Sequence, residues 1–64
     1  MIKLTRFNGN EFVLNCELIK FIEETPDTII TLIDQEKIIV AESADDVVHR
    51  AIAFKRAVRL FPED

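Results

Sequence analysis

The sequence contains one cysteine, one histidine and one glycine, and each shortage excludes a class of site. Cys16 alone cannot close a disulfide within the chain, and His49 alone cannot build a zinc site. A phosphate-binding loop needs several glycines ahead of a helix, which Gly9 alone does not provide. We therefore expect no cofactor and no metal.

Residues suited to catalysis are equally few. Cys16 and His49 fall in segments that we predict to be a strand end and a helix, so we interpret them as a small buried hydrophobe and a solvated helix residue. The paired carboxylates at residues 23–24 and 45–46 are adjacent in sequence, which suits solvation or helix capping. The sequence predicts no enzyme.

Long apolar runs are absent too. No run approaches the roughly 20 residues of a spanning helix, and the first six residues lack the apolar centre of a signal peptide. We expect a cytoplasmic protein without membrane insertion. The count of 8 basic against 12 acidic side chains gives a net charge of −4, which opposes attraction to nucleic acid, so we expect no nucleic-acid partner.

Apolar residues, in contrast, are abundant and occupy 48% of the 64 positions. A chain of this size forms one domain, residues 1–64, and buries only about 60% of the surface that its unfolded form exposes. With no disulfide or metal expected, self-association is the remaining source of extra stability, and we predict a homo-oligomer.

Residues 1–41 predict an antiparallel β-meander of four to five strands. Residues 1–7 alternate apolar and polar side chains, Asn8 and Gly9 indicate a tight turn, and residues 11–15 return. Residues 17–24 fit a helical stripe about as well as a strand, and the turn at residues 25–27 favours the strand. Residues 28–33 and 37–41 are β-branched and apolar on both faces. One face carries Ile30, Leu32, Ile38 and Val40, and the other carries Ile29, Ile33, Ile39 and Ala41. One helix cannot cover both faces, so the second is a candidate interface.

Residues 43–61 predict one C-terminal amphipathic helix packed on the sheet, which makes the fold class α+β. Ser43 is a good N-cap, Asp46 is placed to complete a capping box, and Pro62 ends the helix. The predicted core stripe consists of Val47, Ala51, Phe54, Val58 and Phe61, and it is widened by Val48 and Ile52. Among the aromatic residues, Phe12, Phe21, Phe54 and Phe61 suit a core and Phe7 suits an exposed position. The basic residues Arg50, Lys55, Arg56 and Arg59 favour a solvated face, with an acidic partner as the alternative.

Two motifs in order carry a resemblance to a known family. They are MIKLTRFNG at residues 1–9 with EFVLN at 11–15, and ELI at 17–19 with FIE at 21–23 and TPDT at 25–28. Together with the helix that begins at Ser43, they resemble the FlbD/SwrD family of short flagellar proteins over residues 1–60. Residues 34–36 depart from it, because they stand where the family tends to have a glycine-containing turn. The resemblance implies a cytoplasmic protein at the flagellar base, with relatives tied to swarming motility and to the power of the motor's stator. It implies no enzyme activity and no ligand residues.

Our first hypothesis is a non-enzymatic flagellar accessory protein that self-associates through its sheet. It would bind a motor component, of the stator or the basal body, through Arg6, Phe7, Asn8 and Gly9, although Asn8 and Gly9 could serve the turn alone. The alternative is a small RNA-binding regulator, because residues 1–6 are similar to the start of carbon storage regulator proteins. The net charge of −4 opposes that alternative. A membrane-surface anchor through the helix is a weaker third reading, since the core needs the same apolar residues.

Overall fold

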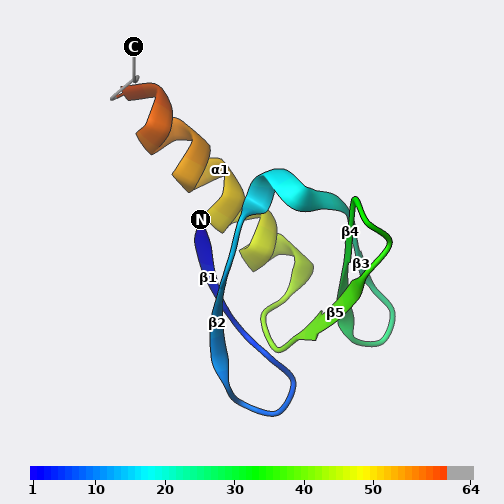
Figure 1. Ribbon diagram of the computed structural model, residues 1–64. Coiled ribbons are helices and arrows are strands. Elements are labelled where there is room, and N and C mark those ends of the chain that lie inside the picture. The colour runs from blue at the N-terminus through cyan, green and yellow to red at the C-terminus, as the bar shows by residue number, and fades with distance from the viewer. Residues whose placement is uncertain (61–64) are drawn as a thin grey trace.

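The computed structural model describes residues 1–60. The strands are β1 (Ile2–Thr5), β2 (Glu11–Leu14), β3 (Ile19–Glu24), β4 (Thr28–Leu32) and β5 (Lys37–Val40). A short 3₁₀ helix, η1 (Cys16–Leu18), precedes β3, and the helix α1 (Ala44–Leu60) follows β5. Five antiparallel strands and one C-terminal helix packed on them confirm the predicted α+β class (Figure 1). The predicted residues Phe61 and Pro62 lie outside the described residues.

The predicted meander is interrupted between β2 and β3. β1 and β2 form a two-stranded sheet, while β3, β4 and β5 form a separate three-stranded sheet. Between them the chain turns into η1, where the Asn15 side chain accepts a hydrogen bond from the Glu17 amide at 3.0 Å. The ambiguous segment at residues 17–24 is therefore split, with its first two residues in a helical turn and the rest in a strand.

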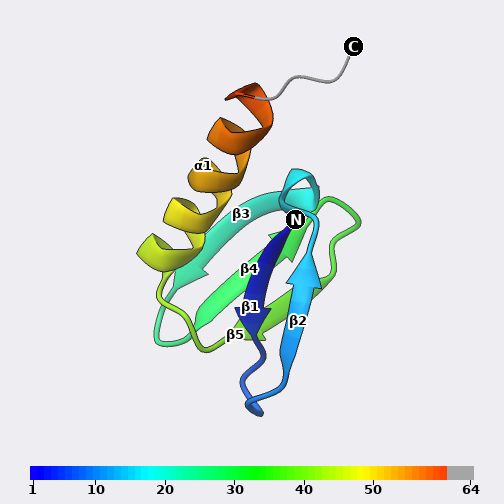
Figure 2. The same cartoon turned by 90° about the vertical axis from the view of Figure 1, so that its left-hand side faces the viewer.

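Backbone contacts after β1 join the two sheets. The Ala41 amide donates to the Thr5 carbonyl at 2.8 Å, and Arg6 forms an isolated antiparallel bridge with Val40. The chain after β1 thus runs beside β5, although more than 30 residues separate them in sequence. Figure 2 shows the β1–β2 hairpin over the other three strands, with α1 running beside β3. The strands curl around one interior.

The core lies between these strands and the first half of α1. Leu4, Ile30 and Val47 are fully buried, one each from β1, β4 and α1. The other buried hydrophobic residues are Ile2, Leu14, Cys16, Leu32 and Val40. Burial of Cys16 agrees with its interpretation as a small core residue.

Four residues predicted for the core are not covered, and two of them, Val48 and Ile52 on α1, are 41% and 45% exposed. Val58 is 50% exposed because the second half of α1 extends beyond the strands, as Figure 1 shows. Phe21 is also 50% exposed, because it lies on the face of the sheet that α1 does not cover. The core stripe of the helix is therefore buried at Val47 and partly buried at Ala51 and Phe54.

Candidate functional site

The turn after β1 is a three-residue hairpin loop. The Arg6 amide donates to the Asn10 carbonyl at 2.7 Å, and the Gly9 amide donates to the Arg6 carbonyl at 2.8 Å. The Asn8 side-chain oxygen accepts from the Asn10 amide at 3.0 Å, and Gly9 adopts a φ of +93°. Asn8 and Gly9 thus shape the turn, one through its side chain and the other through its left-handed backbone.

The other two predicted site residues present their side chains to solvent. Phe7 is 70% exposed, and Arg6 is exposed with its guanidinium 4.4 Å from the centroid of the Phe12 ring. A cation at that distance from a ring face is attracted to it, which restricts the Arg6 side chain without burying it. The structure therefore divides the four predicted residues into a turn-forming pair and an exposed pair.

Phe7 continues into a larger apolar surface on the three-stranded sheet. Its amide donates to the Ile39 carbonyl at 3.3 Å, and Ile39 lies opposite Ile29 in the neighbouring strand. Side chains directly opposite in antiparallel strands share a face, and alternate residues of one strand return to that face. The resulting outer sheet face consists of Phe7, Leu18, Phe21, Ile29, Ile33 and Ile39.

Five of these six side chains are exposed, from 38% for Leu18 to 70% for Phe7. Ile29, Ile33 and Ile39 belong to the second apolar face expected from the sequence, and α1 leaves this face uncovered. In its middle, Thr31 is 2% exposed, and its hydroxyl has no hydrogen-bond partner among the described residues. The face is thus apolar at the surface, with one unsatisfied polar group beneath.

Charged side chains border the outer sheet face. Lys37 lies opposite Thr31, and the Lys20 ammonium is 5.5 Å from the centroid of the Phe21 ring. Arg6 adds a third cation next to Phe7, and Glu23, opposite Ile29, is an acidic neighbour. Glu17, Asp34 and Glu36, which are next in the chain to Leu18, Ile33 and Lys37, are also exposed, so the charges around this face are of both signs.

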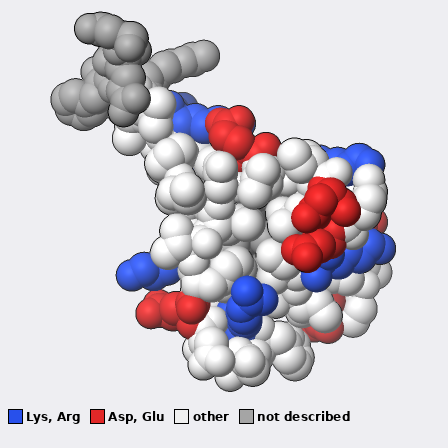
Figure 3. Space-filling model, viewed as in Figure 1, with Lys and Arg blue, Asp and Glu red and all other residues white. Residues whose placement is uncertain are grey.

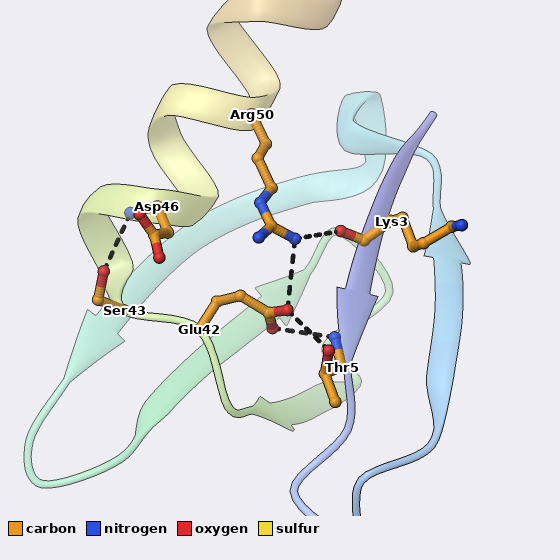
Figure 4. A network of polar contacts seen from close by, with 6 residues as sticks. All are labelled: Lys3, Thr5, Glu42, Ser43, Asp46 and Arg50. Carbon is orange, nitrogen blue, oxygen red and sulfur yellow. Dashed lines mark hydrogen bonds and ion pairs between the residues drawn. The ribbon is translucent and has the colours of Figure 1, made fainter.

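A polar network on another side of the molecule involves Glu42 (Figure 4). Its carboxylate accepts hydrogen bonds from the Thr5 amide at 2.9 Å and from the Thr5 hydroxyl at 2.8 Å. The Arg50 guanidinium lies 3.3 Å from the same carboxylate and donates to the Lys3 carbonyl at 2.6 Å. Burial raises the pKa of Glu42, but the Thr5 hydrogen bonds and the Arg50 charge outweigh it, so the net pKa is lowered.

This network joins β1, the segment after β5 and α1, and no local sequence pattern predicts it. Glu42 stands between a strand and an N-cap, where a charged side chain is ordinary, but its side chain is only 10% exposed. Arg50, which the sequence placed on the solvated basic face, is still 44% exposed, and its guanidinium also contacts Glu42 and the Lys3 carbonyl. The side chain of Arg59 lies outside what the structure describes.

Of the two hydrogen bonds of the predicted capping box at the start of α1, one is present. The Ser43 hydroxyl accepts from the Asp46 amide at 3.1 Å. The reciprocal bond of a capping box is not formed, and the Glu24 carboxylate from β3 accepts from the Ala44 amide at 2.8 Å. Glu24, whose carboxylate was expected to be solvated or to cap a helix, therefore caps α1, which begins 20 residues later.

Few groups suited to catalysis, metal binding or membrane insertion are present in residues 1–60. His49 is exposed whereas Cys16 is buried, and no hydrogen bond between them is present in residues 1–60. No group of three metal-ligating side chains occurs in that range. In the described part of the chain, no helix is both long and apolar enough to cross a membrane.

Comparison with known families places these features in context. Residues 1–59 match the family model FlbD, described as flagellar and swarming motility proteins, which agrees with the resemblance seen in the two motifs. The match spans every strand and nearly all of α1. No curated protein and no solved structure matches the chain.

Proposed function

The chain belongs to the FlbD family of flagellar and swarming motility proteins, and from this premise we propose that it supports the flagellar motor by binding another protein, without catalysis. The observation that carries the proposal is the outer sheet face, where four large apolar side chains are exposed in addition to the Arg6–Phe7 pair. Contiguous apolar surface of this kind is unusual on an isolated chain and typically marks a protein interface.

The face has the composition of a binding site. Phe7 and Phe21 are aromatic side chains that a partner could enclose, and Arg6 is of the type enriched at interfaces. Because the backbone of β3, β4 and β5 is a hydrogen-bonded sheet, binding there requires little ordering of the backbone. A polar group of the partner that reached Thr31 would also satisfy its hydroxyl.

The proposed occupant is a flagellar motor component with an apolar surface bordered by acidic groups, met in the cytoplasm at the flagellar base. Arg6 and Lys20, which adjoin the aromatic residues Phe7 and Phe21, would meet acidic groups of such a partner. A second copy of the chain is the other occupant predicted for the sheet.

The test compares two matched variants in a flagellated host that lacks the chromosomal gene. The double variant Phe7→Ala, Ile39→Ser removes apolar contact from the outer sheet face, and Val13→Ser removes an equally exposed apolar side chain from β2. Swarm expansion and capture of stator or basal-body proteins by the tagged chain are measured for each, with circular dichroism as the folding check.

We expect the double variant to lose both swarming and the captured motor proteins, while Val13→Ser keeps them. A folded double variant that retains both would contradict the proposed site. Recovery of RNA, with no flagellar protein, would instead support the RNA-binding alternative. The comparisons give that alternative no support, and on the face drawn in Figure 3 basic and acidic groups are interspersed with broad uncharged areas.

A further inference from the structure

The helix α1 has a second apolar stripe that the fold leaves open. Asp45, Val48, Ile52 and Lys55 follow one another at steps of three, four and three, which places them on one side of a helix. All four are exposed, with Val48 at 41% and Ile52 at 45%. We call them the outer flank of α1. It is distinct from the buried side of the helix, because Val48 is turned about 100° from Val47 on the helix.

The charged and apolar residues of the outer flank are placed symmetrically about position 50. Asp45 and Lys55 stand five residues before and after position 50, and Val48 and Ile52 stand two residues before and after it. A two-fold axis at position 50 would therefore bring Val48 against Ile52 of a second copy and Asp45 against Lys55 of that copy. One register satisfies both the apolar and the charged pairs.

We propose that two copies of the chain pair through the outer flanks of α1 as antiparallel helices. The occupant is a second copy because the flank is complementary to itself only in this orientation. A parallel pair would set Asp45 against Asp45 and Lys55 against Lys55, which is repulsive at both ends. The contact also leaves the outer sheet face free, so it does not depend on the proposed function.

The position of α1 permits this contact. The helix runs along the outside of the strands, and Figures 1 and 2 both show its second half projecting beyond them. The contact is short, with two apolar side chains and two charged side chains from each copy, so association is weak and favoured by low salt.

The test is sedimentation of the full chain at low ionic strength, with charge-exchanged variants. Asp45→Lys places Lys against Lys55 of the second copy, and Lys55→Asp places Asp against Asp45. Because the two-fold axis repeats the contact, each substitution converts two opposite-charge pairs into like-charge pairs. We expect either variant to raise the dimer dissociation constant about tenfold or more. The control is Asp46→Lys, which makes the same charge change one residue away and off the flank.

An equimolar mixture of Asp45→Lys and Lys55→Asp chains should regain a dimer, because every charged contact between unlike chains is then favourable. The double variant Asp45→Lys, Lys55→Asp should regain it alone. A wild-type chain that stays monomeric, or a dimer equally sensitive to Asp46→Lys, would overturn the proposal. So would a dimer that the two single substitutions leave unchanged, which would place the self-association elsewhere, as on the sheet.

Discussion

Two hairpin turns of this protein share one geometry but differ at the residue that needs a positive φ. In the first turn, Gly9 has a φ of +93°. In the second, which connects β4 to β5, Gln35 has a φ of +78°. The hydrogen bonds correspond, since the Gln35 amide donates to the Leu32 carbonyl at 2.9 Å and the Leu32 amide donates to the Glu36 carbonyl at 2.8 Å. A glycine at position 35 should therefore stabilise the protein, and an alanine at position 9 should destabilise it.

The size of both effects follows from the backbone alone. A side chain in the left-handed region costs about 1–2 kcal/mol, while glycine loses about 0.5–1 kcal/mol more entropy on folding. Gln35→Gly should therefore raise the free energy of unfolding by about 1 kcal/mol, and Gly9→Ala should lower it by a similar amount. Apart from Gly9 and its neighbours Asn8 and Asn10, no described residue has an atom within 4 Å of a Cβ built on Gly9, so a clash with the rest of the fold adds nothing to that loss.

The assay is urea and thermal unfolding of both variants followed by circular dichroism. A change of about 1 kcal/mol corresponds to about 4–8 °C in Tm for a domain of this size. The two variants should shift in opposite directions. If Gln35→Gly lowers the stability, or if both variants shift in the same direction, the backbone explanation of the two turns is refuted.

Three further predictions concern single side chains. Glu42→Gln should cost about 2 kcal/mol at neutral pH, because it removes a charged acceptor from Thr5 and Arg50. The folded-state pKa of Glu42 lies below its ordinary value of 4.5, so its contribution to the free energy of unfolding is present above pH 4.5 and is lost as the pH falls through the folded pKa. Urea unfolding at several pH values should therefore show that the variant loses less stability in acid than the wild type. Ser43→Ala should cost about 1 kcal/mol of unfolding free energy, with Ser43→Gly costing much less, because the hydroxyl caps α1. Thr31→Val should add about 1 kcal/mol in the same measurement by removing an unpaired buried hydroxyl, and a loss of stability would show that the hydroxyl has a partner.

Prediction of the individual elements from the sequence succeeded where the signal is local. Alternation in residues 1–7 and the β-branched run at residues 28–33 correspond to β1 and β4, and Ser43 caps the helix where expected. The strand favoured for residues 17–24 is confirmed over Ile19–Glu24, while residues 17 and 18 belong to η1. Prediction failed for Phe21, which was expected in the core and lies on the uncovered face.

The candidate site was partly visible in the sequence. The turn motif pointed to Arg6, Phe7, Asn8 and Gly9, and the two apolar faces of the last strands pointed to an uncovered surface. The sequence did not show that the turn motif and the apolar face form one surface, because Phe7 contacts Ile39 only when the chain after β1 runs beside β5. That pairing joins residues 32 positions apart, and no local pattern encodes which strand edges meet.

The sequence by itself determined the type of the main elements, the Ser43 cap of the helix, the scarcity of reactive residues and, through two motifs, the family. These depend on neighbours along the chain, which periodicity and turn chemistry report. The tertiary structure alone decided that Glu42 and Arg50 join three segments, that Glu24 caps a distant helix, and that the second half of α1 stands clear of the core. Such contacts depend on packing between segments distant in sequence, which have no sequence period to reveal them.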